Sequence, residues 1–349
     1  SSATTMQEMF YGTPFNQPIG DWDVSSVTNM SGMFCRSSFN QNIQGWNTSK
    51  VTNMASMFRG SSFNQNIQGW DTSKVTTLKD MFYGTSFNQP IGDWDVSSAT
   101  TMQGMFYETP FNQPIGDWNV SSVTTMQGTF NRTPFNQPIG KWDTSNVTNM
   151  TGMFAYASSF NQPIESWNIS SVTSTKWMFQ GASSFNQPIG NWEVSSVQDF
   201  DQMFERKGED AVLEEASSFN QDLGKWIIAP QATVGGMFEE ADSLSLANRK
   251  KIHAAFSSNP NWAYDWATFY RPLPQALSAQ AGTDLNYTFN AKILATGGMP
   301  VTQVAFELAD NILFQKAQTH PANLVDGNFS VNLMLEGGKH YYYRAVATN

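Results

Sequence analysis

The sequence predicts a mainly β solenoid with short helical turns, followed by a helical cap and a β-sandwich. The first observation is a segment that recurs about every 24 residues over two thirds of the 349-residue chain. The second is the alternation of apolar and polar residues within each copy, and the third is a C-terminal region of alternating segments. A short unit with one apolar face cannot bury that face alone, so its copies are expected to stack and share a core.

A strand is predicted at the tryptophan of each repeat. Trp22 and Val24 alternate with Asp21, Asp23 and Ser25, and a period of two is typical of a strand with one buried face. We therefore expect the tryptophans to be buried and the acidic positions to face solvent on a parallel sheet. The tryptophan column, meaning the residues at this position in successive repeats, is Trp22, Trp46, Trp70, Trp94, Trp118, Trp142, Trp167, Trp192 and Trp226.

A short helical turn, α or 3₁₀, is predicted after the strand. Val27, Met30 and Phe34 recur at helical spacing, and Ser25 stands ahead of them as a candidate N-cap. An asparagine follows each break in this pattern, beginning with Asn16. Because backbone groups at solenoid corners miss their sheet partners, we expect these amides to satisfy them. The asparagine column is Asn16, Asn40, Asn64, Asn88, Asn112, Asn136, Asn161, Asn186 and Asn220.

The chain is predicted to contain three regions. The repeats fill residues 1–242, with a charged insertion near 205–216. Residues 243–270 are predicted to form a helical cap that covers the open end of the core, where exposed strand edges would otherwise invite aggregation. Residues 271–349 read as alternating strands of an Ig-like or fibronectin type III-like β-sandwich that is incomplete, and a proline-rich linker leads into it.

The repeat closely resembles a known surface-protein repeat. The pattern W-x-x-S-x-V-T-x-M-x-x-M-F, followed by F-N-Q-x-I, runs from Trp46 to Ile67 and returns through the region from Ser1 to Phe269. It is similar to the repeat of about 25 residues first seen as a domain of unknown function in mycoplasma lipoproteins and related to BspA-like leucine-rich repeats. The resemblance implies a right-handed, leucine-rich-repeat-like solenoid on cell-surface proteins, often adhesin-like, without catalytic residues to carry over.

Composition excludes several classes of partner. Charged residues make up 14% of the chain and the formal net charge is −10, so the clustered Lys and Arg that bind phosphates are missing and nucleic acid is not expected. No apolar run approaches 18 residues, so no membrane span is expected in this segment. The single cysteine, Cys35, rules out a disulfide framework. Because the chain opens inside a repeat, we expect it to be a piece of a longer protein.

The function predicted from these features is non-enzymatic. The three histidines share no motif spacing, and no phosphate loop, HExxH motif or nucleophile elbow occurs. We expect an extracellular repeat segment of a larger cell-surface adhesin that mediates recognition, with a structural segment of an extracellular filament or appendage as the alternative. The expected partner is a glycan or protein on another cell, or identical copies in an assembly.

The candidate binding face is the exposed side of the predicted strands. Its Asp and Asn side chains are expected to accept hydrogen bonds from the backbone two residues on, which would organise the chain reversal. Calcium binding at Asp23, Asp71 and Asp95 is an alternative, because hard cations take carboxylate oxygens, and ice binding by a threonine column beginning at Thr28 is another. The candidate residues are Asp21, Asp23, Asn47, Asp71, Asp93, Asp95, Asp117, Asn119, Asp143, Asn168 and Glu193.

Overall fold

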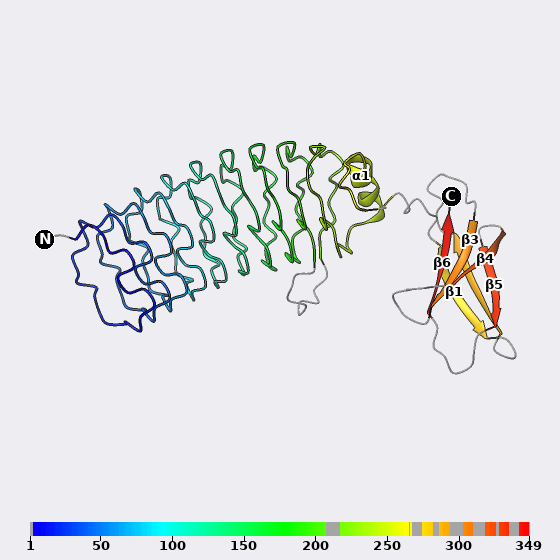
Figure 1. Ribbon diagram of the computed structural model, residues 1–349, viewed down its shortest axis with the longest axis horizontal. Coiled ribbons are helices and arrows are strands. Elements are labelled where there is room, and N and C mark those ends of the chain that lie inside the picture. The colour runs from blue at the N-terminus through cyan, green and yellow to red at the C-terminus, as the bar shows by residue number, and fades with distance from the viewer. Residues whose placement is uncertain are drawn as a thin grey trace. The chain divides into compact units, whose positions relative to one another are not determined.

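The computed structural model describes residues 3–206, 217–264 and 266, together with six strand segments between residues 274 and 348. The chain divides into two compact units, Ser1–Ala263 and Tyr264–Asn349. The first unit is a stack of similar repeats followed by the helix α1 (Leu246–Phe256), and the described strands all belong to the second (Figure 1). The charged insertion predicted near 205–216 falls mainly on residues 207–216, which lie outside the described residues, as does the linker at 271–273.

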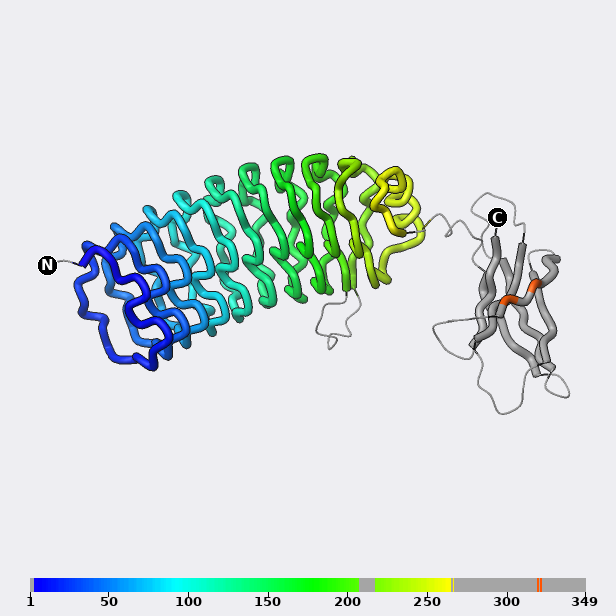
Figure 2. The backbone as a smooth tube through the Cα atoms, in the orientation of Figure 1, coloured from blue at the N-terminus to red at the C-terminus, as the bar shows by residue number. Residues whose placement is uncertain are grey.

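Successive repeats lie against one another along the whole first unit (Figure 2). Equivalent residues are joined by isolated parallel bridges, from the pair Thr5 and Asn29 to the pair Asp199 and Thr233. Among the described residues, none of the repeats contains a strand. The prediction of a mainly β, leucine-rich-repeat-like solenoid with a parallel sheet was therefore wrong, although the stacking of one repeat on the next is present.

The reason is that turns flank the predicted strand: the N–H group of Trp22 donates to the Ile19 carbonyl at 3.1 Å, and the N–H group of Val27 donates to the Val24 carbonyl at 2.9 Å. In the segment that follows, bonds to the next repeat alternate with tight turns. The N–H group of Gly32 donates to the carbonyl of Ala55 in the next repeat at 2.9 Å, and the N–H group of Phe34 donates to Met57 at 2.8 Å. Between them, Cys35 N–H donates back to the Gly32 carbonyl at 3.0 Å and closes a tight turn. Both kinds of bond satisfy backbone groups without a sheet or a helix, so the predicted helical turn is replaced by a chain of hydrogen-bonded turns.

Left-handed residues make these reversals. In the repeat that contains Phe34, Gly32 has φ +63° and Arg36 has φ +54°, and in the next repeat Ser56 has φ +55° and Gly60 has φ +63°. Wherever both positions of a repeat are left-handed, one of the two is glycine. A residue with a Cβ pays about 1–2 kcal/mol in this conformation, so each repeat carries that cost at one position instead of two.

The core consists of aromatic and aliphatic columns shared between repeats. The Phe34 ring stacks on Phe39 with centroids 3.8 Å apart and lies 5.7 Å from Phe58 of the next repeat. Trp46 is 3% exposed, and its indole N–H donates to the Ile19 carbonyl of the preceding repeat at 3.1 Å. The predicted burial of the tryptophans is confirmed from Trp46 to Trp226. It was wrong for Trp22, which is 39% exposed.

The asparagine column forms the predicted ladder. Asn16 Oδ1 accepts the backbone N–H of Asn40 at 2.9 Å and the side-chain amide of Gln41 at 3.1 Å. The same pair of bonds recurs from repeat to repeat until Asn186 Oδ1 accepts from Asn220 and Gln221. Each side-chain oxygen therefore satisfies two donors of the following repeat at the corner of the stack.

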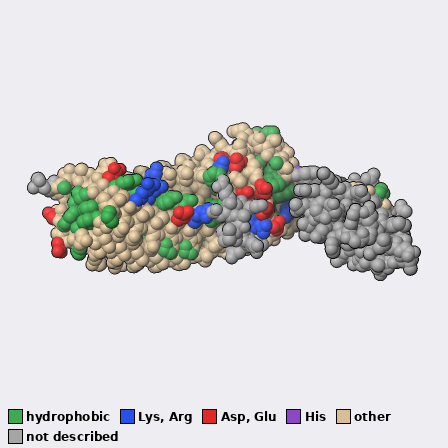
Figure 3. Space-filling view, turned by 60° about the horizontal axis from the view of Figure 1, so that its bottom comes forward, with side chains coloured by type: hydrophobic (Ala, Val, Ile, Leu, Met, Phe, Trp, Pro, Cys, Tyr) green, Lys and Arg blue, Asp and Glu red, His purple; other side chains and the backbone are tan. Residues whose placement is uncertain are grey.

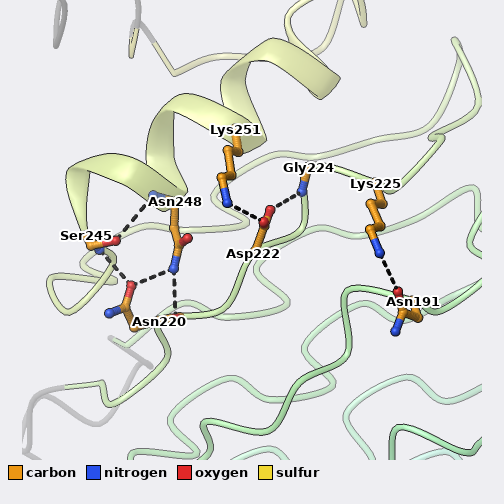
Figure 4. A network of polar contacts seen from close by, with 8 residues as sticks. All are labelled: Asn191, Asn220, Asp222, Gly224, Lys225, Ser245, Asn248 and Lys251. Atoms are coloured by element: carbon orange, nitrogen blue, oxygen red, sulfur yellow. Dashed lines mark hydrogen bonds and ion pairs between the residues drawn. The ribbon is translucent and has the colours of Figure 1, made fainter. Parts of the chain in front are cut away.

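Helix α1 ends this ladder (Figure 4). The backbone N–H of Ser245, its N-cap, donates to Asn220 Oδ1 at 2.8 Å, and Asn248 Nδ2 donates to the same oxygen at 2.9 Å. These two donors take the places that Asn and Gln of a further repeat would occupy. On the apolar side of the helix, Ile252 and Phe256 are buried, and Phe256 lies 6.4 Å from Trp226.

The second unit contains an antiparallel sheet. Its strands follow the order β1-β2-β5-β4-β3-β6, and each neighbouring pair is antiparallel where its register is described. The prediction of a β-sandwich was wrong, because these strands form one hydrogen-bonded series and not two facing sheets. The strands are β1 (Pro274–Ala281), β2 (Asn286–Ile293), β3 (Gln303–Ala309), β4 (Gln318–Val325), β5 (Asn328–Met334) and β6 (Tyr342–Thr348).

Candidate functional site

The predicted binding residues lie on an exposed polar edge of the stack, where their side chains hold the backbone. Asp23 Oδ1 accepts the N–H of Ser25 at 3.0 Å. Asn47 Oδ1 accepts both the N–H of Ser49, at 3.1 Å, and its hydroxyl, at 2.7 Å. All the candidates are exposed, and we call this surface the polar edge. Its residues are Asp21, Asp23, Asn47, Asp71, Asp93, Asp95, Asp117, Asn119, Asp143, Asn168 and Glu193.

The same hydrogen bonds set the charge state of the polar edge. The hydroxyl and N–H of Ser73 hold the pKa of Asp71 below its ordinary value, and serines two residues on do the same for the other acids of this column. Asp71 and Asp23 are separated by the repeat that carries Asn47. In the described part of the chain, no group of three or more His, Cys, Asp or Glu side chains is gathered for a metal ion. The polar edge therefore has a clear structural role, that of closing each chain reversal.

The remaining acids of the polar edge form isolated contacts. The Gln68 amide donates to Asp93, and Lys141 pairs with Asp117 at 3.2 Å with both side chains at least 85% exposed. Lys225 donates to Asn191 Oδ1 at 3.0 Å (Figure 4). Both residues stand directly before a tryptophan of the column, as Lys141 and Asp117 do. Exposed pairs of this kind contribute only about 0–1 kcal/mol.

The threonine column is fixed in one orientation. The hydroxyl of Thr52 donates to the Thr28 carbonyl at 3.2 Å, and the N–H of Thr52 donates to the same carbonyl at 2.8 Å. The bond recurs in each repeat, which leaves a single file of exposed threonines. The column is Thr28, Thr52, Thr76, Thr100, Thr124, Thr148 and Thr173.

A second surface differs from repeat to repeat. It surrounds the left-handed residues, and we call it the variable edge. While the buried columns repeat nearly the same residues, these three columns change in size, charge and aromaticity. They are Glu8, Gly32, Ser56, Asp80, Gly104, Gly128, Gly152, Trp177, Gln202 and Gly236; Tyr11, Cys35, Arg59, Tyr83, Tyr107, Asn131, Ala155, Gln180, Glu205 and Glu239; and Gly12, Arg36, Gly60, Gly84, Glu108, Arg132, Tyr156, Gly181, Arg206 and Glu240.

Planar groups stack along the variable edge. The Arg59 guanidinium lies 4.4 Å above the ring of Tyr83, and Tyr83 stacks on Tyr107 with centroids 4.4 Å apart and planes within 1°. Asp80 pairs with Arg59 at 3.1 Å. Further along, Arg132 lies 4.4 Å over the ring of Tyr156. Since the repeat spacing brings neighbouring side chains together, Tyr83, Tyr107 and Tyr156 each pack against a planar group of the preceding repeat.

Burial raises the pKa of two carboxyl groups on the variable edge. Removal from water raises the pKa of Asp80, although Arg59 opposes this change. Burial likewise raises the pKa of Glu205, whose Oε2 accepts the amides of Gln180 at 2.5 Å and Gln202 at 2.7 Å. Figure 3 shows one face of the molecule, on which basic, acidic and apolar side chains lie among a majority of other types. Such mixtures with Tyr, Trp and Arg are common where proteins recognise partners.

Sequence reasoning missed the variable edge because it searched for repeated columns. The signal was present in the residues that do not repeat, such as Tyr11, Cys35 and Arg59 at equivalent positions. Among copies that otherwise share their sequence, an exposed position that changes is free of the demands of the fold. This marks it as available for recognition.

The stacked repeats, the shared aromatic core and the side-chain ladders define a repeat protein. The family model described as "Mycoplasma protein of unknown function, DUF285" matches residues 4–110, 36–134, 108–209 and 209–259, and the chain belongs to this family. No curated protein and no solved structure matches the chain. Among the described residues, no helix has the length and apolar character needed to cross a membrane.

Proposed function

We propose that this chain is a non-enzymatic recognition segment of a larger extracellular cell-surface protein that mediates adhesion. The observation that carries the proposal is the change of size, charge and aromaticity along the variable edge, beside buried columns that stay nearly uniform. The similarity of the repeats to mycoplasma and BspA-like surface repeats supports an extracellular location. In this proposal the invariant columns build the scaffold and the variable edge contacts the partner.

The polar edge is the weaker choice for a binding surface. Asn119 Oδ1 already accepts the N–H of Ser121 at 3.1 Å and its hydroxyl at 2.7 Å, so a ligand would compete with bonds that shape the backbone. The variable edge instead presents side chains such as Tyr11, which is 47% exposed, and Trp177, which is 38% exposed. Aromatic and Arg side chains supply most of the energy in many interfaces.

A structural segment of an extracellular filament is the second candidate. It is favoured by the uniform stacking of the repeats, whose equivalent residues are joined from the pair Thr5 and Asn29 to the pair Asp199 and Thr233. Light scattering would show assembly that increases with protein concentration, and no ligand would bind in any binding assay. That pair of results would favour this candidate over recognition.

The proposed function is tested with the full chain on a glycan array and on a suspension of intact cells. The fourfold variant Tyr11→Ala/Arg36→Ala/Arg132→Ala/Tyr156→Ala removes side chains from two separate parts of the variable edge, and Lys141→Ala removes one exposed charge from the polar edge. Recognition through the variable edge predicts that only the fourfold variant loses binding. If Lys141→Ala loses binding and the fourfold variant retains it, the partner contacts the polar edge and the assignment to the variable edge is wrong.

A further inference from the structure

We propose that a hollow on the variable edge binds the neutral pyranose ring of a saccharide; the inference rests on the proposed recognition function and gives it a ligand class. The hollow has a volume of about 330 Å³ and spans the first three repeats. This volume falls in the range of pockets that hold small ligands. The side chains that matter for binding are Glu8, Tyr11, Ser31, Cys35, Arg36 and Arg59.

The hollow exists because one column of large side chains is interrupted. Arg59, Tyr83 and Tyr107 stack in successive repeats at 4.4 Å. In the same column the preceding repeat has the short side chain of Cys35, and the one before it has Tyr11. With a rise of about 4.8 Å per repeat, Tyr11 and Arg59 are about 9.6 Å apart along the stack. One ring of ordinary thickness fits at the level of Cys35 and would continue the stack.

Small residues form the rest of the hollow. Gly32 is left-handed at φ +63°, and Ala55 and Ser56 belong to the next repeat. The Glu8 side chain lies close to Gly32: a Cβ added there would lie 2.9 Å from Glu8 Cγ, so Glu8 forms one wall of the hollow. The open space lies beside that wall.

The polar groups of the hollow suit hydroxyls. Arg36 makes no ion pair among the described residues, whereas Arg59 is paired with Asp80 at 3.1 Å. Glu8 and Arg36 carry opposite charges on the two sides, so the hollow has no net charge to attract an ion. A carboxylate accepts hydrogen bonds, and a guanidinium and serine hydroxyls donate them. Together they match the alternating donors and acceptors of a neutral sugar.

Tyr11 supplies the apolar contact that orients the ring. Its side chain is 47% exposed and borders the hollow, so its aromatic face is accessible to the C–H groups of a pyranose. Aromatic residues combine a large apolar face with a low entropic cost of ordering. Cys35, 5% exposed, serves only as the short side chain at the level of the ring. The arrangement thus combines one aromatic face with hydrogen-bonding groups on both sides.

The test fills the hollow with a side chain that the column already tolerates. Cys35→Tyr places between Tyr11 and Arg59 the residue found at Tyr83 and Tyr107, and Asn131→Tyr makes the same kind of change in a distant repeat as the matched control. After a neutral saccharide array identifies a ligand, calorimetry measures its affinity. We expect Cys35→Tyr to weaken binding by about tenfold or more, which corresponds to about 1.4 kcal/mol, and Asn131→Tyr to leave it unchanged.

A second pair of variants keeps the test informative if Cys35→Tyr misfolds. Tyr11→Ala changes an exposed side chain and is expected to lose about tenfold in affinity, whereas its counterpart Tyr83→Ala retains binding. Undiminished affinity in both Cys35→Tyr and Tyr11→Ala would overturn the hollow as the site and leave recognition intact. Adhesion to cells without binding to any neutral saccharide, or binding of planar aromatic compounds in its place, would also overturn it. Absence of both adhesion and saccharide binding in the wild type would refute the proposed function as well.

Discussion

The indole N–H of Trp94 donates to the carbonyl of Ile67 in the preceding repeat at 3.1 Å, while the ring itself is 3% exposed. One side chain thus fills the core and satisfies a backbone acceptor of a neighbouring repeat. The same bond joins each member of the tryptophan column from Trp46 to Trp226 to the repeat before it.

Replacement of Trp94 by alanine is expected to lower the free energy of unfolding by about 3–5 kcal/mol, because a large cavity forms and the Ile67 carbonyl loses its donor. Urea denaturation measures the change. Trp22→Ala is the matched control, since Trp22 is 39% exposed and has no such partner, and its effect should be clearly smaller. Equal losses for the two variants would show that the interior repeats do not depend on this contact.

The asparagine ladder predicts that a substitution in one repeat destabilises the repeat that follows it. In Asn112→Ala, the N–H of Asn136 and the amide of Gln137 lose the oxygen that they share at 2.9 and 3.1 Å. Leaving a buried donor unpaired costs about 1–3 kcal/mol, so stability should fall and the Asn136 amide should exchange faster with deuterium. Gln137→Ala removes only one donor and serves as the control. Unchanged protection of Asn136 in Asn112→Ala would contradict the role of the ladder.

Acid should remove the contribution of the polar-edge carboxylates to the stability of the fold. The Ser145 hydroxyl and N–H hold the pKa of Asp143 below its ordinary value of 3.8. A lowered folded pKa means that the carboxylate stabilises the fold above the unfolded pKa and that this contribution is lost as pH falls through the folded pKa. Asp143→Ala should therefore melt at a lower temperature than wild type near neutral pH, and the difference should shrink below about pH 4.

Asp143→Asn separates the charge from the hydrogen bond in that experiment. Asparagine occupies the same column at Asn119, where its oxygen accepts from Ser121. The variant should keep most of the stability near neutral pH and lose the dependence on acid. A difference between Asp143→Ala and wild type that stays constant down to strongly acidic pH would exclude the carboxylate as its source.

The end of the stack depends on Asn248. Its side-chain amide donates to the Asn220 backbone carbonyl at 2.8 Å and to Asn220 Oδ1 at 2.9 Å. Asn248→Ala should cost about 1–3 kcal/mol and increase deuterium exchange in the last repeat, because both acceptors lose a donor. Ala247→Ser, at an exposed neighbouring position of α1, is the control and should behave as wild type. Equal exchange in the two variants would show that the Asn248 amide does not hold the last repeat.

The sequence predicted features that return at a constant interval. Buried Trp94 and the oxygen of Asn112 could be assigned because the same residue occupies the same place in each copy. The sequence could not show that no strand forms at Trp22, because a few alternating residues also fit a chain that reverses repeatedly. The glycines that reveal those reversals alternate between the columns of Gly32 and Gly60, so neither column reads as a glycine position. The variable edge escaped notice for the related reason that its residues share no type.

The bonds at Asn220 carry a consequence for the evolution of the chain. Ser245 and Asn248 contact nothing in that ladder that is particular to the last repeat, because every asparagine of the column offers the same oxygen. A gene that gained or lost one whole period by unequal recombination would therefore still encode a chain whose last asparagine meets the same helix. The number of repeats, and with it the length of the variable edge, can therefore change by one repeat at a time while the same helix still closes the stack.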